Sequence, residues 1–115
     1  MSRFQRKHRL NSEADFNNVF KTSCRSRDSQ FVVLARRNRK AFARLGLAIS
    51  RKAVKTAVSR NKVKRAIRES FRTHADILTG LDIVVLAQQQ IKPGESRKMN
   101  QSLRSHWQRI LQCAR

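Results

Sequence analysis

The chain has 115 residues, 39% of them hydrophobic, which suits one compact domain with a modest core. Its 27 Lys and Arg face only 7 Asp and Glu, giving a formal net charge of +20. Such an excess of positive charge destabilises a compact fold unless a polyanion binds to it. The charge balance therefore predicts a nucleic-acid-binding protein. The longest apolar run, residues 83–87, is far shorter than the roughly 20 residues that cross a bilayer, which argues against a membrane protein.

The N-terminal residues and the two cysteines further limit the class of protein. Residues 1–10 are basic and polar with no apolar stretch after them, so we expect a mobile basic arm rather than a secretion signal. Cys24 and Cys113 are isolated and lack metal-ligand spacing, so we expect two reduced thiols in a cytoplasmic protein rather than a disulfide scaffold. Three glycines and one proline leave little room for linkers, and residues 1–115 are predicted to form a single domain.

The first predicted element is a short helix over residues 12–22. Ser12 is a suitable N-cap, and Glu13 and Asp15 suit the positive end of the helix. Apolar side chains then recur at helical spacing on one face: Phe16, Val19 and Phe20.

Two strands are predicted next, over residues 30–37 and roughly 42–50. The first strand is apolar on both faces, with Phe31, Val33 and Ala35 on one and Val32 and Leu34 on the other. The second strand has large residues on one face (Leu45, Leu47, Ile49) and small ones on the other (Gly46, Ala48, Ser50). The small residues leave this second face bare, with room for another group to lie on it.

Residues 56–74 form the strongest predicted helix. One face carries the groups that would pack on the sheet: Val63, Ile67, Ser70, Phe71 and His74. The adjoining side carries a basic stripe at four-residue spacing, with Arg65 beside it: Arg60, Lys64, Arg68 and Arg72. Between residues 36 and 72 there are fourteen Lys or Arg and a single acid, Glu69. Like charges four residues apart destabilise a helix, so this stripe predicts a binding surface rather than a merely solvated face.

A buried strand over residues 82–87 and an amphipathic helix over residues 96–113, with Trp107 in its apolar stripe, complete the chain. The predicted fold is α+β, a two-layer α/β sandwich. Its order is helix, two strands, a short third strand near 50–53 if one forms, helix, strand, helix. Two helices would cover one sheet face and the first helix would lie beside the other. The general rule for crossover connections predicts a right-handed one.

The first helix and the bare strand face predict a second binding surface. A slot between them, edged by Arg51 and Lys52 and close to Val32 and Leu34, suits single-stranded nucleic acid, whose bases stack on aromatic rings such as Phe16. The alternative is that these apolar side chains are simply core.

Catalysis by the chain alone has little support. His8, His74 and His106 have no partner at metal-ligand spacing, and the seven acids are scattered with no pair suited to a two-metal site. The sequence therefore predicts a binding protein whose partner supplies any chemistry.

Short motifs follow one another along nearly the whole chain. The first half carries Arg9-Leu10, Asp15-Phe16, Val19-Phe20, Phe31-Val32, Leu45-Gly46-Leu47 and Ser50-Arg51-Lys52. The second half carries Ala57-Val58-Ser59-Arg60-Asn61, Lys64-Arg65, Ile67-Arg68-Glu69, Phe71-Arg72 and Asp82-Ile83-Val84-Val85. With the core pattern Arg-Asn-x-x-Lys-Arg-x-x-Arg, these motifs resemble those of the bacterial ribonuclease P proteins. One position departs from the family, whose signature is usually Arg-Asn-Arg, because Lys62 keeps the charge but lacks the bidentate fork of arginine.

The resemblance implies a left-handed crossover, against the general rule, and two RNA-binding surfaces. The long helix would contact the catalytic RNA through Arg60, Asn61, Lys62, Lys64, Arg65 and Arg68. The cleft beside the first helix would hold the 5′ leader of precursor tRNA, with Phe16, Phe20, Leu34, Arg51 and Lys52 as candidates. The RNA subunit, with Mg²⁺, would cut the phosphodiester, so no catalytic or metal-binding residue and no further protein partner is expected here.

Three other functions remain as alternatives. A ribosomal or other structural RNA-binding protein has the same size and charge. A nuclease acting alone needs a carboxylate cluster that the sequence lacks. A DNA-binding regulator fits the charge, but the predicted strands do not resemble a helix-turn-helix arrangement.

Overall fold

The computed structural model of the chain describes residues 6–22, 24–89, 91–92 and 94–114. The three helices are α1 (Glu13–Phe20), α2 (Ala57–His74) and α3 (Ser96–Ala114), and a 3₁₀ turn (Arg6–His8) precedes them. The four strands are β1 (Arg25–Arg27), β2 (Phe31–Arg37), β3 (Arg44–Ala48) and β4 (Leu81–Ala87). The six longer elements lie within two residues of their predicted bounds.

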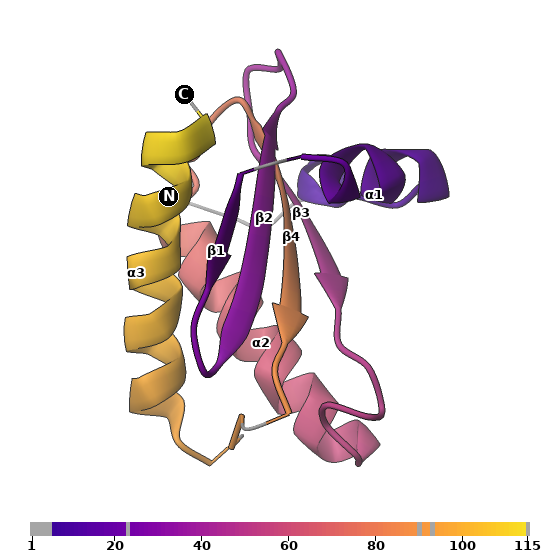
Figure 1. Cartoon of the computed structure of the whole chain (residues 1–115), viewed down its shortest axis with the longest axis vertical. Helices are drawn as coiled ribbons and strands as arrows, with labels where there is room; N and C mark the ends of the chain where they lie inside the picture. The colour runs from indigo at the N-terminus through magenta and orange to yellow at the C-terminus, as the bar shows by residue number, and fades with distance from the viewer. Residues whose placement is uncertain (1–5, 23, 90, 93, 115) are drawn as a thin grey trace.

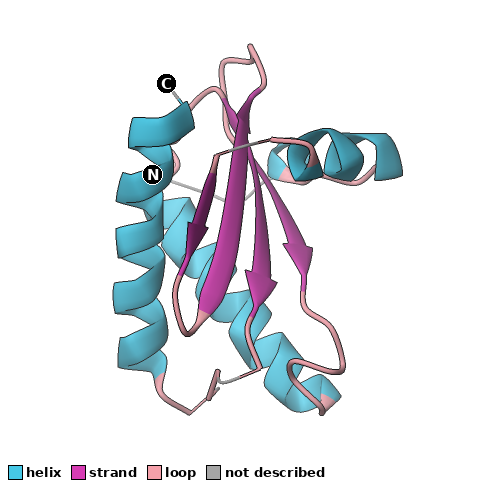
Figure 2. Ribbon diagram, viewed as in Figure 1, coloured by secondary structure: helices cyan, strands magenta, loops and turns pink. Residues whose placement is uncertain are grey.

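The strands form one sheet in the order β1-β2-β4-β3. β2 is antiparallel to β1 and β4, whereas β3 and β4 are parallel and joined through α2. Figures 1 and 2 show α2 and α3 on one face of the sheet and α1 against the other. This is the α+β sandwich that the sequence predicts.

The connection from β3 through α2 to β4 is left-handed. Both strands point down in Figure 1, α2 passes behind them, and the chain steps from β3 to its left-hand neighbour β4. The general right-handed prediction is therefore wrong and the expectation from the resemblance holds. The left-handed turn places α2 beside α3 on the same face, which leaves the opposite face to α1.

The short extra strand lies elsewhere than predicted. Residues 51–54 form turns rather than a strand, and the amide of Val54 donates to the carbonyl of Ser50 (3.0 Å). The extra strand is β1, in which Ser26 lies opposite Val33 of β2. Its Arg-Ser-Arg sequence has no apolar alternation, so hydrophobic periodicity gave no signal for it.

The main core lies between the sheet and the pair α2 and α3. The predicted inward faces are confirmed, since Phe31 of β2 and Ile67 of α2 are buried there. Trp107 of α3 is fully buried, and its indole Nε1 donates to Ser70 Oγ of α2 (2.8 Å). This bond satisfies the polar end of the tryptophan and joins the two helices.

A disulfide joins the two cysteines, which corrects the expectation of two unpaired thiols. Cys24, next to the start of β1, is bonded to Cys113 near the end of α3, with the Cα atoms 5.6 Å apart. The two residues are separated by 89 positions in the chain. Only the packing of α3 along β1 brings them together, so their spacing in the sequence gave no indication.

The basic arm is anchored over its second half. Residues 1–5 lie outside the described residues, but Arg9 forms a parallel bridge with Leu45 of β3. The amide of Leu10 donates to the carbonyl of Leu45 (3.0 Å), and the Leu10 side chain is buried. The expectation of a mobile arm over residues 1–10 is therefore wrong for residues 9 and 10, which extend the sheet at its β3 edge.

Candidate nucleic-acid interface

The basic stripe lies on the outer side of α2. Thr56 caps this helix, accepting a hydrogen bond at Oγ1 from the amide of Ser59 (3.1 Å). Its apolar side, including Val63 and Ile67, is buried against the sheet as predicted. The basic residues therefore line the remaining side of a helix that is held firmly, about 6 Å apart per four-residue step along the axis.

Two arginines of the stripe are engaged within the chain. Arg60 turns back, and its Nη1 donates to the carbonyls of Val54 (3.1 Å) and Lys55 (3.0 Å), which holds the loop before α2. Arg72 pairs with Glu69, the one acid of this helix. That pair lowers the pKa of Glu69 through the hydrogen bond from Arg72. Arg60 keeps only part of its guanidinium for a ligand.

The side chains of the other predicted members have no hydrogen bond or ion pair within the described part of the chain. They are Asn61, Lys62, Lys64, Arg65 and Arg68, and all but the half-buried Lys64 are exposed. Four uncompensated cations on one helix form a surface that phosphates would neutralise.

α1 crosses the other face of the sheet, with its apolar side inward. Oγ of Ser12 accepts a hydrogen bond from the amide of Asp15 (3.1 Å), so Ser12 caps the helix as predicted. Val19 is fully buried against Leu34 and Val84, which belong to a second, smaller apolar cluster. Leu34 is only 2% exposed, so its place in the predicted leader cleft is corrected: it packs beneath α1 and offers no surface.

Phe16 lies directly on Gly46 of β3. A Cβ atom built on this glycine would come within 2.6 Å of Cζ of Phe16, so the close contact requires glycine. The bare strand face is thus filled by an aromatic ring at Gly46. The slot predicted from the small residues is shorter than expected, and it starts beyond this contact, at Ala48.

Phe20 remains at the surface. Its side chain is 37% exposed, and its ring lies 6.4 Å from that of Phe16, centroid to centroid. Arg25 fixes the end of α1 by donating from Nη2 to the carbonyl of Phe20 (3.1 Å). Two neighbouring rings, one half-buried and one exposed, therefore border the uncovered part of the sheet face.

That uncovered part is a row across the sheet. The strand register places Arg27, Val32, Leu86 and Ala48 side by side, one row beyond the residues that α1 covers. The three apolar members are only partly buried, and Arg27 is exposed. Arg51 and Lys52 are exposed in the turns after β3. Figure 1 shows the segment that follows β3 leaving the sheet at the end far from α1. We call the space bordered by Phe16, Phe20 and this row the α1 groove.

A small pocket of about 230 Å³ connects the α1 side to the basic stripe. Phe16 and Gly46 line it from one side, and Lys64 and Arg68 of α2 line it from the other. The N-terminal segment contributes Arg9. The two surfaces predicted separately thus meet at the β3 edge.

His106 lies in a buried polar group with Ser26 and Asp28. His106 is fully buried, with Nδ1 2.7 Å from Oγ of Ser26 and Nε2 3.1 Å from Oδ1 of Asp28. Burial lowers the pKa of His106 despite the nearby carboxylate. For Asp28, desolvation raises the pKa, but hydrogen bonds from Ser102 and two backbone amides outweigh it and lower the pKa to about 2. Ser26, His106 and Asp28 have the composition of a hydrolase triad. No substrate can reach the imidazole of His106, because it is fully buried. The group joins α3 to β1 and the loop after it.

Metal binding and membrane insertion find no structural support in the described ranges. No three His, Cys, Asp or Glu side chains converge there as ligands. No helix in that part of the chain is both long and apolar enough to cross a bilayer.

Comparison with known proteins identifies the family of the chain. The family model described as Ribonuclease P matches residues 4–111. The chain belongs to the ribonuclease P protein family. The ribonuclease P protein component of Methylococcus capsulatus is 46% identical over 90% of this chain and 81% of its own length. That of Aliivibrio salmonicida is 39% identical over 97% and 96%.

Solved structures of ribonuclease P proteins share the fold. The Staphylococcus aureus protein superposes with a TM-score of 0.80 at 35% identity, over 88% of this chain and 93% of that one. The Thermotoga maritima protein, in complex with 1-(4-fluorophenyl)-2-thiourea, gives 0.71 at 33% identity, over 89% and 95%. A further S. aureus structure is of a mutant with defective mRNA degradation activity (0.71, 31%, over 94% and 88%).

Within this ribonuclease P fold, sequence reasoning missed two kinds of residue. Arg27 and Leu86 complete the row in the α1 groove, but only the strand register reveals it. Arg36, Arg37 and Arg39 border a separate cavity, although the count of basic residues before α2 had included them without a role.

Proposed function

We propose that the chain is the protein subunit of the ribonuclease P ribonucleoprotein, which removes the 5′ leader from precursor tRNA. The observation that carries this proposal is the junction of two surfaces in a member of this family. An uncompensated basic helix, α2, adjoins the α1 groove at the β3 edge. In the proposal, α2 contacts the catalytic RNA and the groove holds the leader.

The α1 groove suits a single strand. Phe16 and Phe20 offer ring surface, the row through Val32 offers apolar contact, and Arg27 and the turn after β3 offer positive charge. A base stacked on an aromatic side chain gains about 1–3 kcal/mol without needing a particular sequence. Because mature tRNA has no leader, binding in this groove favours the precursor over the product.

The chemistry itself is assigned to the RNA, with Mg²⁺. Folding RNA and docking a precursor onto it bring phosphates together, and the basic face of the protein offsets that repulsion. The role that follows for this chain is to bind, orient and lower the Mg²⁺ concentration that the RNA needs.

Reconstitution tests the proposal. A bacterial ribonuclease P RNA is incubated with precursor tRNA at low Mg²⁺, with and without the protein, and the 5′ end of the product is mapped. We expect cleavage at the mature 5′ end only when RNA and protein are both present. No stimulation by folded protein with a competent RNA would overturn the proposal.

The protein alone forms a third arm of the same experiment. One related structure is named for mRNA degradation activity, so the protein is also incubated with RNA in the absence of the catalytic RNA. Cleavage of precursor tRNA in this arm would make the chain itself the nuclease.

The second candidate function is a structural RNA-binding protein. It is favoured by charge alone and gives the exposed ring of Phe20 no role. Such a protein binds its RNA equally well after Phe20→Ala, whereas a leader-binding subunit loses preference for leader-bearing tRNA.

A further inference from the structure

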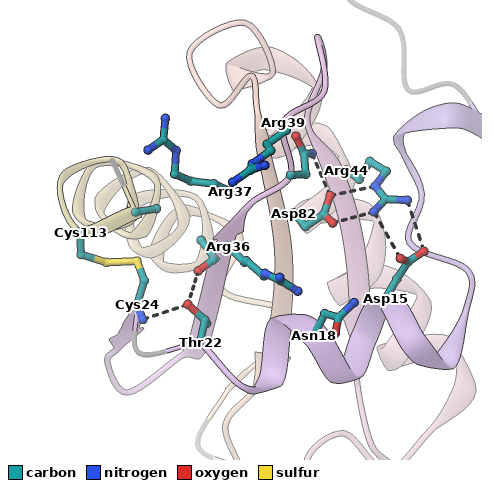
Figure 3. A pocket seen from close by; sticks show the side chains of 13 residues that line it. Asp15, Asn18, Thr22, Cys24, Arg36, Arg37, Arg39, Arg44, Asp82 and Cys113 are labelled. Atoms are coloured by element: carbon teal, nitrogen blue, oxygen red, sulfur yellow. Dashed lines mark hydrogen bonds and ion pairs between the residues drawn. A yellow bond between two sulfur atoms is a disulfide. The ribbon is translucent and has the colours of Figure 1, made fainter.

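A cavity of about 910 Å³ opens on the side of α1 opposite the α1 groove (Figure 3). Its walls come from α1, from the end of β2 with the loop after it, and from the end of α3. Asn18 and Thr22 line it from α1, and Cys113 lines it from α3. Phe16 and Phe20 are not among its lining residues. The cavity is thus separate from both surfaces described above, and the volume is ample for a nucleotide.

Arginines dominate the charge of this cavity. Four line it, Arg36, Arg37, Arg39 and Arg44, against the two acids Asp15 and Asp82, which leaves a net charge of +2. Both acids are already paired with one arginine. Arg44 Nη2 lies 2.6 Å from Oδ2 of Asp82, and Nη1 lies 3.3 Å from Oδ2 of Asp15.

The side chains of the other three arginines have no hydrogen bond or ion pair within the described residues, and all three residues are exposed. Figure 3 shows the side chain of Arg36 extending between β2 and α1, on the same side as Asn18. Successive side chains of a strand alternate, so Arg36 and Arg37 lie on opposite sides of β2, and Figure 3 shows Arg37 extending away from Arg36 toward the end of α3. The guanidinium groups of Arg36, Arg37 and Arg39 thus line the cavity from different sides, repel one another and have no acid paired with them in the described part of the chain. An anion in the cavity relieves that repulsion, and the planar fork of arginine matches the oxygens of a phosphate.

The wall that carries these arginines is held in place. Nδ2 of Asn38 donates a hydrogen bond to Oδ1 of Asp82 (2.8 Å), and Oδ1 of Asn38 accepts one from the amide of Lys40 (2.8 Å). Arg39 has a φ of 59°, in the left-handed region that suits glycine or asparagine better than arginine. The disulfide between Cys24 and Cys113 fixes the opposite wall. Binding a ligand therefore requires little ordering of the backbone.

The cavity also has neutral donors. β1 ends before it reaches the end of β2, so Arg37 lies on an open edge. The amide of Ala35 donates to the carbonyl of Cys24 at this edge (3.1 Å), and by strand alternation the amide of Arg37 faces the same way with no strand opposite. The Asn18 amide, on α1, is within the same hollow and can reach a ribose or a base edge.

We propose that this cavity, which we call the arginine pocket, binds the phosphodiester backbone of an RNA strand, with Arg36, Arg37 and Arg39 contacting its phosphates. The inference rests on the proposed function for the identity of the ligand as RNA. It adds a third contact, across α1 from the groove for the leader. The strand comes from the catalytic RNA or from the body of the precursor, and the two arms of the test distinguish them.

The test compares full-length variants that lose the same charge in different places. Arg36→Gln with Arg37→Gln removes two cations from the arginine pocket. Arg97→Gln with Arg104→Gln removes two exposed cations from α3, outside the pocket, and is the matched control. The first arm measures affinity for a bacterial ribonuclease P RNA from 50 to 400 mM salt. The second measures affinity of the assembled holoenzyme for precursor tRNA.

We expect the pocket variant to bind one of these RNAs about tenfold more weakly, with the salt slope reduced by about 1.5 for two lost phosphate contacts. The control variant should change affinity by less than about threefold, because it loses only general attraction. Loss in the first arm assigns the phosphate to the catalytic RNA, and loss in the second arm alone assigns it to the precursor. Equal behaviour of the two variants in both arms would overturn the proposal.

Two further measurements keep the result decisive. Arg36→Lys with Arg37→Lys retains the charge and tests the bidentate fork, and we expect an intermediate loss. This variant also replaces the Gln pair if that pair fails to fold, as judged by circular dichroism, and affinity equal to wild type would then overturn the proposal. Failure of the wild-type protein to bind the catalytic RNA would instead refute the proposed function.

Discussion

On one face of the sheet, α2 and α3 bury Phe31, Ile67 and Trp107 in a continuous core. On the other face, α1 covers a smaller cluster around Val19 and leaves Phe20 exposed beside a partly open row of strand residues. The first face holds the molecule together, and the second exchanges some of that stability for a surface on which a ligand can lie. The comparison shows that the role of an apolar residue in this fold depends on which face of the sheet it lies on, rather than on which amino acid it is.

The largest expected effect comes from the core face. Trp107→Ala removes a fully buried ring and the bond to Ser70, and should lower the free energy of unfolding by about 4 kcal/mol. Phe20→Ala, the control from the other face, should cost less than about 1 kcal/mol because its ring is already exposed. Urea unfolding measures both. Similar losses would contradict the division between the two faces.

The disulfide sharpens the same comparison, because it ties α3 to the edge of the sheet. Cys113→Ser should lower the free energy of unfolding by about 2–4 kcal/mol under oxidising conditions, since the bond closes a loop of 89 positions in the unfolded chain. The difference between variant and wild type should vanish when both are unfolded in excess reductant. A variant as stable as the oxidised wild type would show that the bond does not form in solution.

Gly46 tests how tightly α1 is seated on the open face. Gly46→Ala places a Cβ atom against the ring of Phe16 and should destabilise the protein by about 1–3 kcal/mol. Adding Phe16→Ala removes the obstructing ring, so the double variant should lose less than the sum of the two single changes. Thermal unfolding of the four proteins measures this coupling. Strict additivity would mean that the ring does not lie on this glycine.

The smallest effect concerns pH and the buried group that joins α3 to β1. His106 has a lowered pKa in the folded state through burial, so the unfolded state binds more protons below about pH 6.5. Stability should therefore be fully present above the unfolded pKa and decrease as the pH falls below it. The carboxyl of Asp28 has a pKa of about 2 in the folded state against its ordinary value of 3.8, so a second loss of stability is expected as the pH falls between those two values.

His106→Gln is the control for the first of these losses. It removes the titration near neutral pH, so its stability should change less between pH 7.5 and pH 5 than that of the wild type. Chemical unfolding at both values measures the difference. A wild-type protein that becomes more stable as the pH falls from 7.5 to 5 would contradict the buried, neutral imidazole.

Much of the fold could be predicted because its elements carry strong local signals. The run of β-branched and aromatic residues in β2 and the four-residue spacing in α2 located both elements to within a residue, and the small side chains of β3 marked the face on which α1 lies. β1 carried no such signal, since Arg25, Ser26 and Arg27 are polar and acquire a strand conformation only from pairing with β2.

The binding surfaces could be predicted only where they follow one element. The stripe on α2 repeats along a single helix, so its members were identifiable, although the turn of Arg60 back to its own loop was not. Leu34 was placed in the cleft by its strand face alone, but α1 buries it. The arginine pocket draws on three distant segments and a disulfide, and no local pattern indicates such a combination.

The most direct test of the central claim, two surfaces with separate tasks, measures two affinities for two variants. One affinity is that of the protein for a bacterial ribonuclease P RNA, and the other is the preference of the holoenzyme for leader-bearing over mature tRNA. We predict that Arg65→Ala weakens the first and leaves the second. We predict that Phe20→Ala spares the first within about twofold and lowers the second by roughly tenfold, the loss of a stacked base. Equal losses of both quantities in both variants would contradict the account.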